Sequence, residues 1–218
     1  MCFLFKDVIE IRKKLFKNRE EWMSYVSADY DPDVLEKETR EKINQYLKER
    51  DKKEKWMSWN NLSDRWKNYF IDILHTTAKM SKDENTKVGS LIIDTERKVV
   101  VSSSWNDLPR GVKHNSERNS RPLKYLYTLH AEQGCLINAL RLNVDVNNLT
   151  MLTTLGCCPM CSCSIVNSGL SEVVTPELDY NHVSCGELYE HSVNIMKEGG
   201  VNWLFDNKLK LPAARYPG

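Results

Sequence analysis

Two short stretches, His130-Ala131-Glu132 and Cys158-Pro159-Met160-Cys161, decide how the rest of the sequence is interpreted. Zinc prefers four tetrahedral ligand positions and binds imidazole nitrogen and thiolate sulfur well. One histidine and two cysteines can fill three of these positions, and the fourth can then hold a water molecule. Glu132 follows the histidine closely and is placed to handle the protons of that water. The two stretches therefore predict a zinc site that activates water.

A structural zinc site with four protein ligands is the alternative interpretation of the same residues. The side chains that could supply the fourth ligand are Cys157, Cys163, His182, Cys185 and His191. A closed site of this kind has no open position for water. It also gives Glu132 no role, so we favour the open site.

Composition limits the class of protein. The 218 residues suffice for one sizeable domain, and 41% of them are hydrophobic, which allows a real core. A formal net charge of +1 argues against a protein that grips long nucleic acids, because such proteins usually carry a broadly basic surface. No apolar run reaches membrane-spanning length. The clustering of cysteines around 157–163 suits metal binding in a reducing compartment, so we expect a cytoplasmic protein.

Hydrophobic periodicity predicts alternating helices and strands after residue 55. The expected helices lie within 56–81, 130–142, 158–168 and 185–197. The expected strands are 88–94, 98–104, 151–155, 172–175 and 201–205. This α-β-β-α-β-α-β-α-β order predicts a three-layer α/β/α sheet domain.

The chain divides into three parts in this prediction. Residues 1–57 form a charged helical extension, which could be a packing arm or an oligomerisation or regulatory element. Residues 58–208 form the main domain, and 209–218 an irregular tail. Within the main domain, 105–129 is expected to be a long polar connection.

The arrangement of these motifs resembles that of zinc-dependent base deaminases, whose signature is H-x-E followed later by P-C-x-x-C. Over about residues 59–205 the chain is similar to the deoxycytidylate (dCMP) deaminases of the cytidine deaminase-like superfamily. Residues 66–70 resemble the family's first helix, and S-K-D-E-N-T-K-V-G at 81–89 resembles its S-K-D-P-N-T-K-V-G-A stretch. W-N-D-L-P-R-G-V at 105–112 resembles its Y-N-G-x-P-x-G loop, and K-Y-L-Y at 124–127 also matches.

The resemblance implies a cytidine deaminase-like fold, a Zn²⁺ cofactor and the hydrolysis of dCMP to dUMP and ammonia, which feeds dTMP synthesis. It also implies a homo-oligomer, with dCTP and dTTP as possible effectors. Two alternatives stay open. One is a deaminase of a modified cytosine or purine nucleotide, and the other is a catalytically silent, nucleotide-binding protein of the same fold.

Site residues follow from the resemblance position by position. His130, Cys158 and Cys161 are the implied zinc ligands, and Glu132 is the implied proton shuttle. Asn106 matches an asparagine that holds the sugar or the base. The other residues expected near the substrate are Asn85, Lys87, Tyr127 and Ala131.

A phosphate needs cationic partners, and one segment is rich in them. Residues 110–124 contain Arg110, Lys113, His114, Arg118, Arg121 and Lys124 against a single acid, Glu117. Arginine can meet a phosphate with two parallel hydrogen bonds. We expect Arg121 or Lys124 to bind the phosphate. Because the basic excess is confined to this segment, a small nucleotide is favoured over a polynucleotide.

Three positions depart from the family pattern. Cys157 replaces the proline before the first zinc cysteine, and could be a packing residue, a competing ligand or a redox-sensitive thiol. Gly134-Cys135 replaces the usual Asn-Ala, which removes a polar side chain that we expect near the pocket. Asp107 replaces the loop glycine. The last two changes are the reason for considering another substrate.

Overall fold

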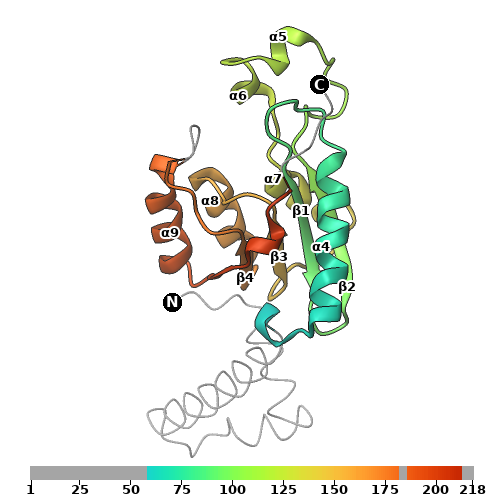
Figure 1. The fold of residues 1–218 in the computed structure, drawn as a ribbon, viewed down its shortest axis with the longest axis vertical. Coiled ribbons are helices and arrows are strands. Elements are labelled where there is room, and N and C mark those ends of the chain that lie inside the picture. The colour runs from blue at the N-terminus through green and yellow to red at the C-terminus, as the bar shows by residue number, and fades with distance from the viewer. Residues whose placement is uncertain (1–57, 182–185, 213–218) are drawn as a thin grey trace, which may run out of the picture. The chain divides into compact units, whose positions relative to one another are not determined.

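The computed structural model describes residues 58–181 and 186–212 (Figure 1). These residues belong to one compact unit, Met57–Gly218. The helical extension predicted for 1–57 lies outside the described residues and stays a prediction. None of the helices in the described ranges is long and apolar enough to cross a membrane.

Five strands form one mixed sheet in the order β2-β1-β3-β4-β5. The strands are β1 (Gly89–Asp94), β2 (Val99–Trp105), β3 (Thr150–Thr153), β4 (Glu172–Thr175) and β5 (Asn202–Phe205). β1 runs antiparallel to both of its neighbours, whereas β3, β4 and β5 run parallel to one another. Each strand lies where the hydrophobic pattern predicts one.

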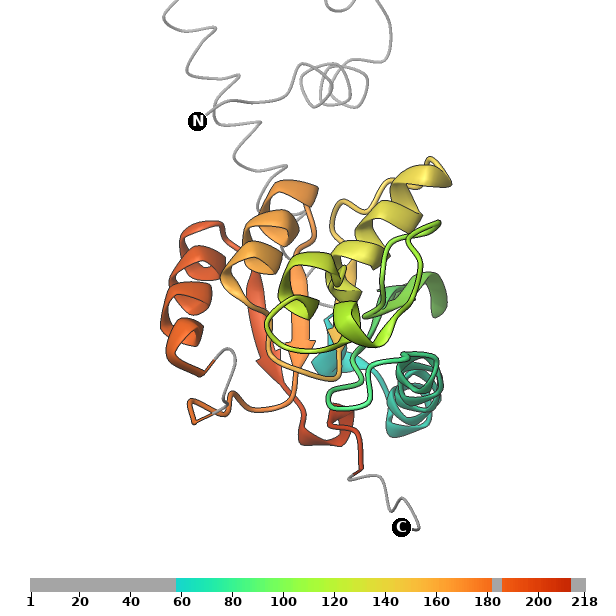
Figure 2. The ribbon, with the colours of Figure 1, turned by 90° about the horizontal axis from the view of Figure 1, so that it is seen from above.

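Helices cover both faces of this sheet (Figures 1 and 2). One face is covered by α4 (Asp64–Lys79), and the other by α7 (Ala131–Arg141), α8 (Pro159–Ser168) and α9 (Tyr189–Glu198). α7 connects β2 to β3, α8 connects β3 to β4 and α9 connects β4 to β5. In each case the two strands are parallel, and the chain moves across the sheet in the same direction. Because such connections are almost always right-handed, their helices share a face. The predicted three-layer α/β/α fold is confirmed.

The two cores follow from side-chain alternation along the central strands. Leu91 and Ile93 point to the core beneath α4, and Ile92 points to the core beneath α7, α8 and α9. Because β1 lies inside the sheet, it is buried along its whole length. The sheet therefore holds α4 and α7 on opposite sides of the same strand.

Local sequence signals set the ends of α8. Cys158 is its N-cap and Pro159 its first residue, a position where the missing N–H of proline costs nothing. Gly169 ends the helix in the left-handed conformation, with a φ of 84°. Both signals are visible in the sequence, and they fix the position of Cys158 at the start of the helix.

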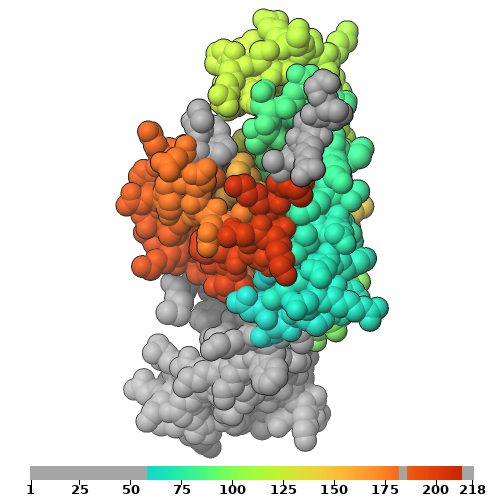
Figure 3. Space-filling model, in the orientation of Figure 1, coloured from blue at the N-terminus to red at the C-terminus, as the bar shows by residue number. Residues whose placement is uncertain are grey.

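Two short helices lie inside the predicted connection 105–129. They are α5 (Ser116–Asn119) and α6 (Lys124–Tyr127), and Figure 3 shows their segment at one end of the domain, beyond the carboxyl end of α4. A single helical turn is too short to give a periodic pattern, so the sequence did not predict them. Near the other boundary, a 3₁₀ helix at Asn207–Leu209 places Leu209 in the core beneath α4.

Gly89 allows α4 to pack directly on β1, and this contact gives a test of the fold. A Cβ at this position would lie 2.8 Å from the backbone nitrogen of Ala78 and 2.9 Å from the carbonyl oxygen of Leu74. Since backbone atoms cannot rotate away, Gly89→Ala should lower the free energy of unfolding by about 1–3 kcal/mol, measured by urea denaturation. The control is Ser103→Ala on the exposed side of β2, which should change it by less than about 0.5 kcal/mol. Equal stability of the two variants would contradict this packing.

Candidate active site

The residues of both sequence motifs meet because the starts of α7 and α8 converge. His130 is the N-cap residue of α7, and Glu132 lies in its first turn. Cys158 is the N-cap residue of α8, and Cys161 lies in its first turn. Neither cap side chain makes a capping hydrogen bond, so both are available for another partner. The positive ends of two helix dipoles therefore face the same group of side chains.

Three of these side chains form a group that can hold a metal ion. His130 Nδ1 lies 3.5 Å from Cys158 Sγ and 3.4 Å from Cys161 Sγ, and all three atoms lie within 4.8 Å of one another. Tetrahedral zinc, with bonds of about 2.3 Å to sulfur and 2.0 Å to nitrogen, requires a separation of about 3.5 Å between nitrogen and sulfur. The geometry and the donor types therefore fit zinc.

The described residues add no fourth protein ligand to this group. Cys157 is buried within the core beneath α7 and α8, Cys163 is exposed, and His191 is not part of the group. The remaining candidates of the four-ligand alternative, His182 and Cys185, lie outside the described residues. Within the described ranges, the arrangement matches the open site, in which one position is left for water.

Hydrogen bonding distributes the protons of this group in the metal-free protein. The hydrogen bonds from Cys161 and His130 lower the pKa of the Cys158 thiol to about 4, despite its burial. The hydrogen bond to Cys158 raises the pKa of His130 to about 9. The hydrogen bond to Cys158, together with burial, also raises the pKa of Cys161. A metal ion needs two thiolates and a neutral imidazole, so its binding near neutral pH must displace protons from His130 and Cys161.

Glu132 is a buried carboxyl group in the wall of the same cavity. Glu132 is only 4% exposed. This burial raises the pKa of its carboxyl group, although the charge of His130 acts in the opposite direction. A carboxyl with a raised pKa is suited to accept a proton and to return it near neutral pH. The position and the chemistry of Glu132 agree with the predicted proton shuttle.

The cavity brings together most of the predicted substrate-binding residues. The predicted residues in its lining are His130, Ala131, Glu132, Cys158, Asn106, Arg121 and Lys124. They come from the carboxyl end of β2, the segment before α7 and the starts of α7 and α8. This is the edge of the sheet where ligands commonly bind in α/β folds.

Three of the predicted substrate-binding residues do not line this cavity. The Lys87 ammonium donates to the carbonyl of Ser81 at 2.6 Å, which holds the turn before β1. The backbone N–H of Asn85 donates to Asp83. The ring of Tyr127 lies 4.9 Å from the guanidinium carbon of Arg118. Their placement favours a role in the walls around the cavity rather than direct contact with a substrate.

Several lining residues were missed by the sequence reasoning. They are Asp83, Thr86, Val88, Tyr125, Thr128, Leu155 and Gly156. One signal was available for Asp83, since an aspartate often accepts hydrogen bonds from backbone N–H groups two and three residues further on. Another was available for Leu155 and Gly156, which lie at the end of a predicted strand and just after it, before a predicted helix.

Comparison with known proteins agrees with this geometry. The family model for the cytidine and deoxycytidylate deaminase zinc-binding region matches residues 64–177, more than half of the chain. The chain belongs to the cytidine and deoxycytidylate deaminase family. The zinc-binding region that gives this family its description includes the group of His130, Cys158 and Cys161.

Two relatives show how far the sequence similarity reaches. An "uncharacterized deaminase in luxG 3′region" of Aliivibrio fischeri is 32% identical over 143 residues, which cover 64% of this chain and 94% of that protein. Human deoxycytidylate deaminase is 30% identical over 115 residues, which cover 50% of this chain. The matched part spans 63% of the length of the human protein.

A solved structure shows the same fold. The dCMP deaminase from the cyanophage S-TIM5, in complex with dCMP and dUMP, superposes with a TM-score of 0.54. The match covers 66% of this chain and 99% of that chain, at 18% sequence identity. At this identity the similarity concerns the fold, which is the cytidine deaminase-like arrangement predicted from the sequence.

The departures from the family pattern can now be placed. A Cβ at Gly134 would lie 2.3 Å from Ser104 Oγ, so a side chain here would meet β2, and Gly134 does not line the cavity. Our expectation that its replacement removes a polar group from the pocket is therefore not met. Asp107 lies 3.0 Å from His114 Nε2 and accepts a hydrogen bond from Trp105 Nε1. It thus braces the loop in which the family has glycine.

Loss of either cysteine of the metal group should remove the metal. Cys158→Ser and Cys161→Ser are expected to purify with far less zinc than the stoichiometric content of the unmodified chain, because a hydroxyl is a poor zinc ligand at neutral pH. Elemental analysis of the purified proteins measures this. Cys163→Ser is the matched control, since Cys163 is exposed on the same helix and should keep full zinc. Full zinc in Cys158→Ser would refute the proposed ligand set.

Proposed function

We propose that this chain is a zinc-dependent deaminase that hydrolyses dCMP to dUMP and ammonia. The observation that carries the proposal is the meeting of the metal-binding group and the buried Glu132 in one cavity. Membership of the deaminase family supports the reaction. The human relative, a deoxycytidylate deaminase, and the cyanophage enzyme bound to dCMP and dUMP support the substrate.

Zinc, when bound by His130, Cys158 and Cys161, supplies a Lewis acid that lowers the pKa of water. The Glu132 carboxylate takes a proton from the attacking water and passes it to the ring nitrogen next to the carbon under attack. The same group then takes the second proton of the water, from the hydroxyl now bonded to the ring carbon, and delivers it to the exocyclic amine, so that the carbon–nitrogen bond breaks and ammonia leaves. The buried position of Glu132 keeps bulk water from competing for these protons.

The charges at the cavity favour Arg121 over Lys124 as the partner of the substrate phosphate. Lys124 is 7% exposed, and its ammonium is paired with Asp83 at 2.8 Å. Arg121 is exposed and lines the cavity, and its guanidinium carbon lies 5.7 Å from the centre of the Tyr125 ring. Among the described residues, no carboxylate forms an ion pair with Arg121. Its charge is therefore available to an anionic ligand.

The two alternative functions are less well supported than dCMP deamination. The alternative of a modified cytosine or a purine nucleotide loses one of its reasons, because Gly134 lies against β2 and not in the cavity. A catalytically silent protein would not need Glu132 beside the metal group. The cytoplasmic location, the homo-oligomer and the dCTP and dTTP effectors stay predictions.

Replacement of Glu132 should stop the reaction without removing the metal. Glu132→Gln keeps the shape of the side chain but cannot accept a proton, so kcat for dCMP should fall by about 10²–10⁴-fold. Release of ammonia and the change in ultraviolet absorbance from dCMP to dUMP measure the rate, and zinc content is measured on the same samples. Turnover by Glu132→Gln at the rate of the unmodified enzyme would refute its role. Absence of turnover in the zinc-loaded unmodified enzyme would refute the function.

Arg121 should matter for the phosphate and not for the base. Arg121→Ala should raise KM for dCMP by about 10- to 100-fold, the range expected for loss of a charged hydrogen bond, and leave KM for deoxycytidine within about twofold. Arg118→Ala is the matched control, because Arg118 also packs on a tyrosine of this segment but does not line the cavity. An equal loss with both substrates would show that Arg121 does not bind the phosphate.

A further inference from the structure

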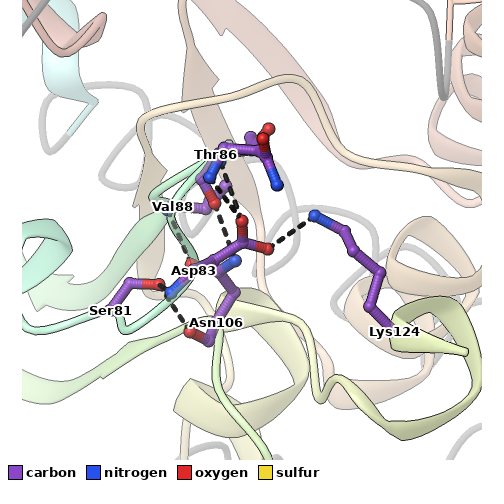
Figure 4. Close-up of polar contacts among 7 residues, drawn as sticks. Ser81, Asp83, Thr86, Val88, Asn106 and Lys124 are labelled. Atoms are coloured by element: carbon purple, nitrogen blue, oxygen red, sulfur yellow. Dashed lines mark hydrogen bonds and ion pairs between the residues drawn. The ribbon is translucent and has the colours of Figure 1, made fainter. Parts of the chain in front are cut away.

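A largely buried ion pair lies in the wall of the cavity. Lys124 Nζ lies 2.8 Å from Asp83 Oδ2, and the two side chains are 8% and 12% exposed. Asp83 lies between α4 and β1, whereas Lys124 is the first residue of α6, so the pair joins two segments far apart in the sequence (Figure 4). Neither segment contributes a metal-binding residue. The reaction proposed above gives this pair no role.

The second carboxylate oxygen of Asp83 shapes a turn. Asp83 Oδ1 accepts the backbone N–H groups of Asn85 at 2.9 Å and Thr86 at 3.0 Å. Burial alone would raise the pKa of Asp83, but the hydrogen bonds from Lys124 and from these two N–H groups lower it further than burial raises it. Asp83 is therefore ionised at neutral pH, and it fastens the turn 83–86 to the start of α6.

The same turn holds the side-chain amide of Asn106. Asn106 Nδ2 donates to the carbonyl of Thr86 at 2.9 Å, and Asn106 Oδ1 accepts from the backbone N–H of Val88 at 2.8 Å (Figure 4). The N–H of Val88 can only donate, so the orientation of the amide is fixed. One N–H of the amide and one oxygen lone pair stay available. Both belong to a residue that lines the cavity.

We propose that the Asp83–Lys124 ion pair positions the nucleotide substrate, by holding the turn that orients Asn106 and by keeping the charge of Lys124 away from the phosphate. The inference rests on the dCMP deaminase function proposed above. Asp83 and Lys124 are positioning residues in this account, since they act through Asn106 and through the charge of the cavity wall. The phosphate then meets the charge of Arg121 and not that of Lys124.

Loss of one partner should be worse than loss of both, because it leaves a buried charge without a counterion. Lys124→Met leaves the Asp83 carboxylate in the wall, where it repels the phosphate. Asp83→Asn keeps an oxygen that can accept hydrogen bonds from the backbone of the turn, but it leaves the Lys124 ammonium without its counterion. The ammonium can then bind the phosphate or Glu132 and pull that group out of its catalytic position. The double variant Asp83→Asn/Lys124→Met has neither charge.

The experiment is a double-mutant cycle with the zinc-loaded full chain, assayed with dCMP and with deoxycytidine. Each single substitution should lower kcat/KM for dCMP by about 10- to 100-fold, and the double substitution by less than about 10-fold. In Lys124→Met the loss of kcat/KM should come from a higher KM, and it should be larger for dCMP than for deoxycytidine. In Asp83→Asn the loss of kcat/KM should come from a lower kcat. A merely structural role would not separate KM from kcat in this way.

A second aspartate–cation pair, whose Arg97 side chain is exposed, supplies the control. Asp94 accepts the backbone N–H groups of Glu96 and Arg97 and is paired with the Arg97 guanidinium at 2.7 Å, in the turn between β1 and β2. Neither residue lines the cavity. Asp94→Asn and Arg97→Met should leave kcat/KM for both substrates within about twofold. The same KM and kcat pattern in these variants would overturn the proposal.

Two other outcomes would also overturn it. Additive losses in the cycle would show that the two charges do not act as a pair. Equal loss of dCMP turnover in Lys124→Met and in the double variant would make Lys124 a direct phosphate ligand.

If the unmodified enzyme does not turn over dCMP, the proposed function fails, and calorimetric titration of the four proteins with dCMP tests the positioning alone. The double variant should then regain the affinity lost in Lys124→Met, and failure to regain it refutes the positioning.

Discussion

The convergence of two helix N-termini is the constraint on which the rest of this structure depends. α7 and α8 each begin at a residue whose side chain belongs to the metal-binding group. Both helices lie on the same face of the sheet. Each connects two parallel strands, and such connections are almost always right-handed, which places their helices on one face. Their positive dipole ends favour the thiolate that the hydrogen bonds already stabilise at Cys158. The fold thus supplies an environment in which a cationic metal and anionic sulfurs can meet.

The same convergence places a carboxyl group where it can transfer protons. Glu132 lies in the first turn of α7, and its burial raises its pKa. Cys157, next to the motif, is buried in the core beneath α7 and α8. The chemistry of the cavity therefore depends on packing around α7 and α8 as much as on the metal-binding side chains themselves.

Charge arranges another part of the cavity lining. Asp83 neutralises one cation and shapes a turn, and the turn fixes the amide of Asn106. Arg121, on the same segment as Lys124, lacks a carboxylate partner among the described residues and stacks near Tyr125. The lining of the cavity thus combines groups suited to proton transfer with groups that we propose orient an anionic nucleotide.

The sequence by itself determined the strand order along the chain, the three-layer fold and the identity of the metal-binding group. These features depend on the spacing of residues along the chain. That spacing can be read in the sequence from H-x-E, C-x-x-C, Pro159 and Gly169. The tertiary structure alone decided which partner each cation has. Arg121 and Lys124 are equivalent candidates in the sequence, and only the approach of Asp83 from a distant segment separates them. It also decided that Gly134 faces β2 and that Asn106 is held by Thr86 and Val88. These contacts join segments far apart in the chain, and neither residue type nor spacing records such contacts.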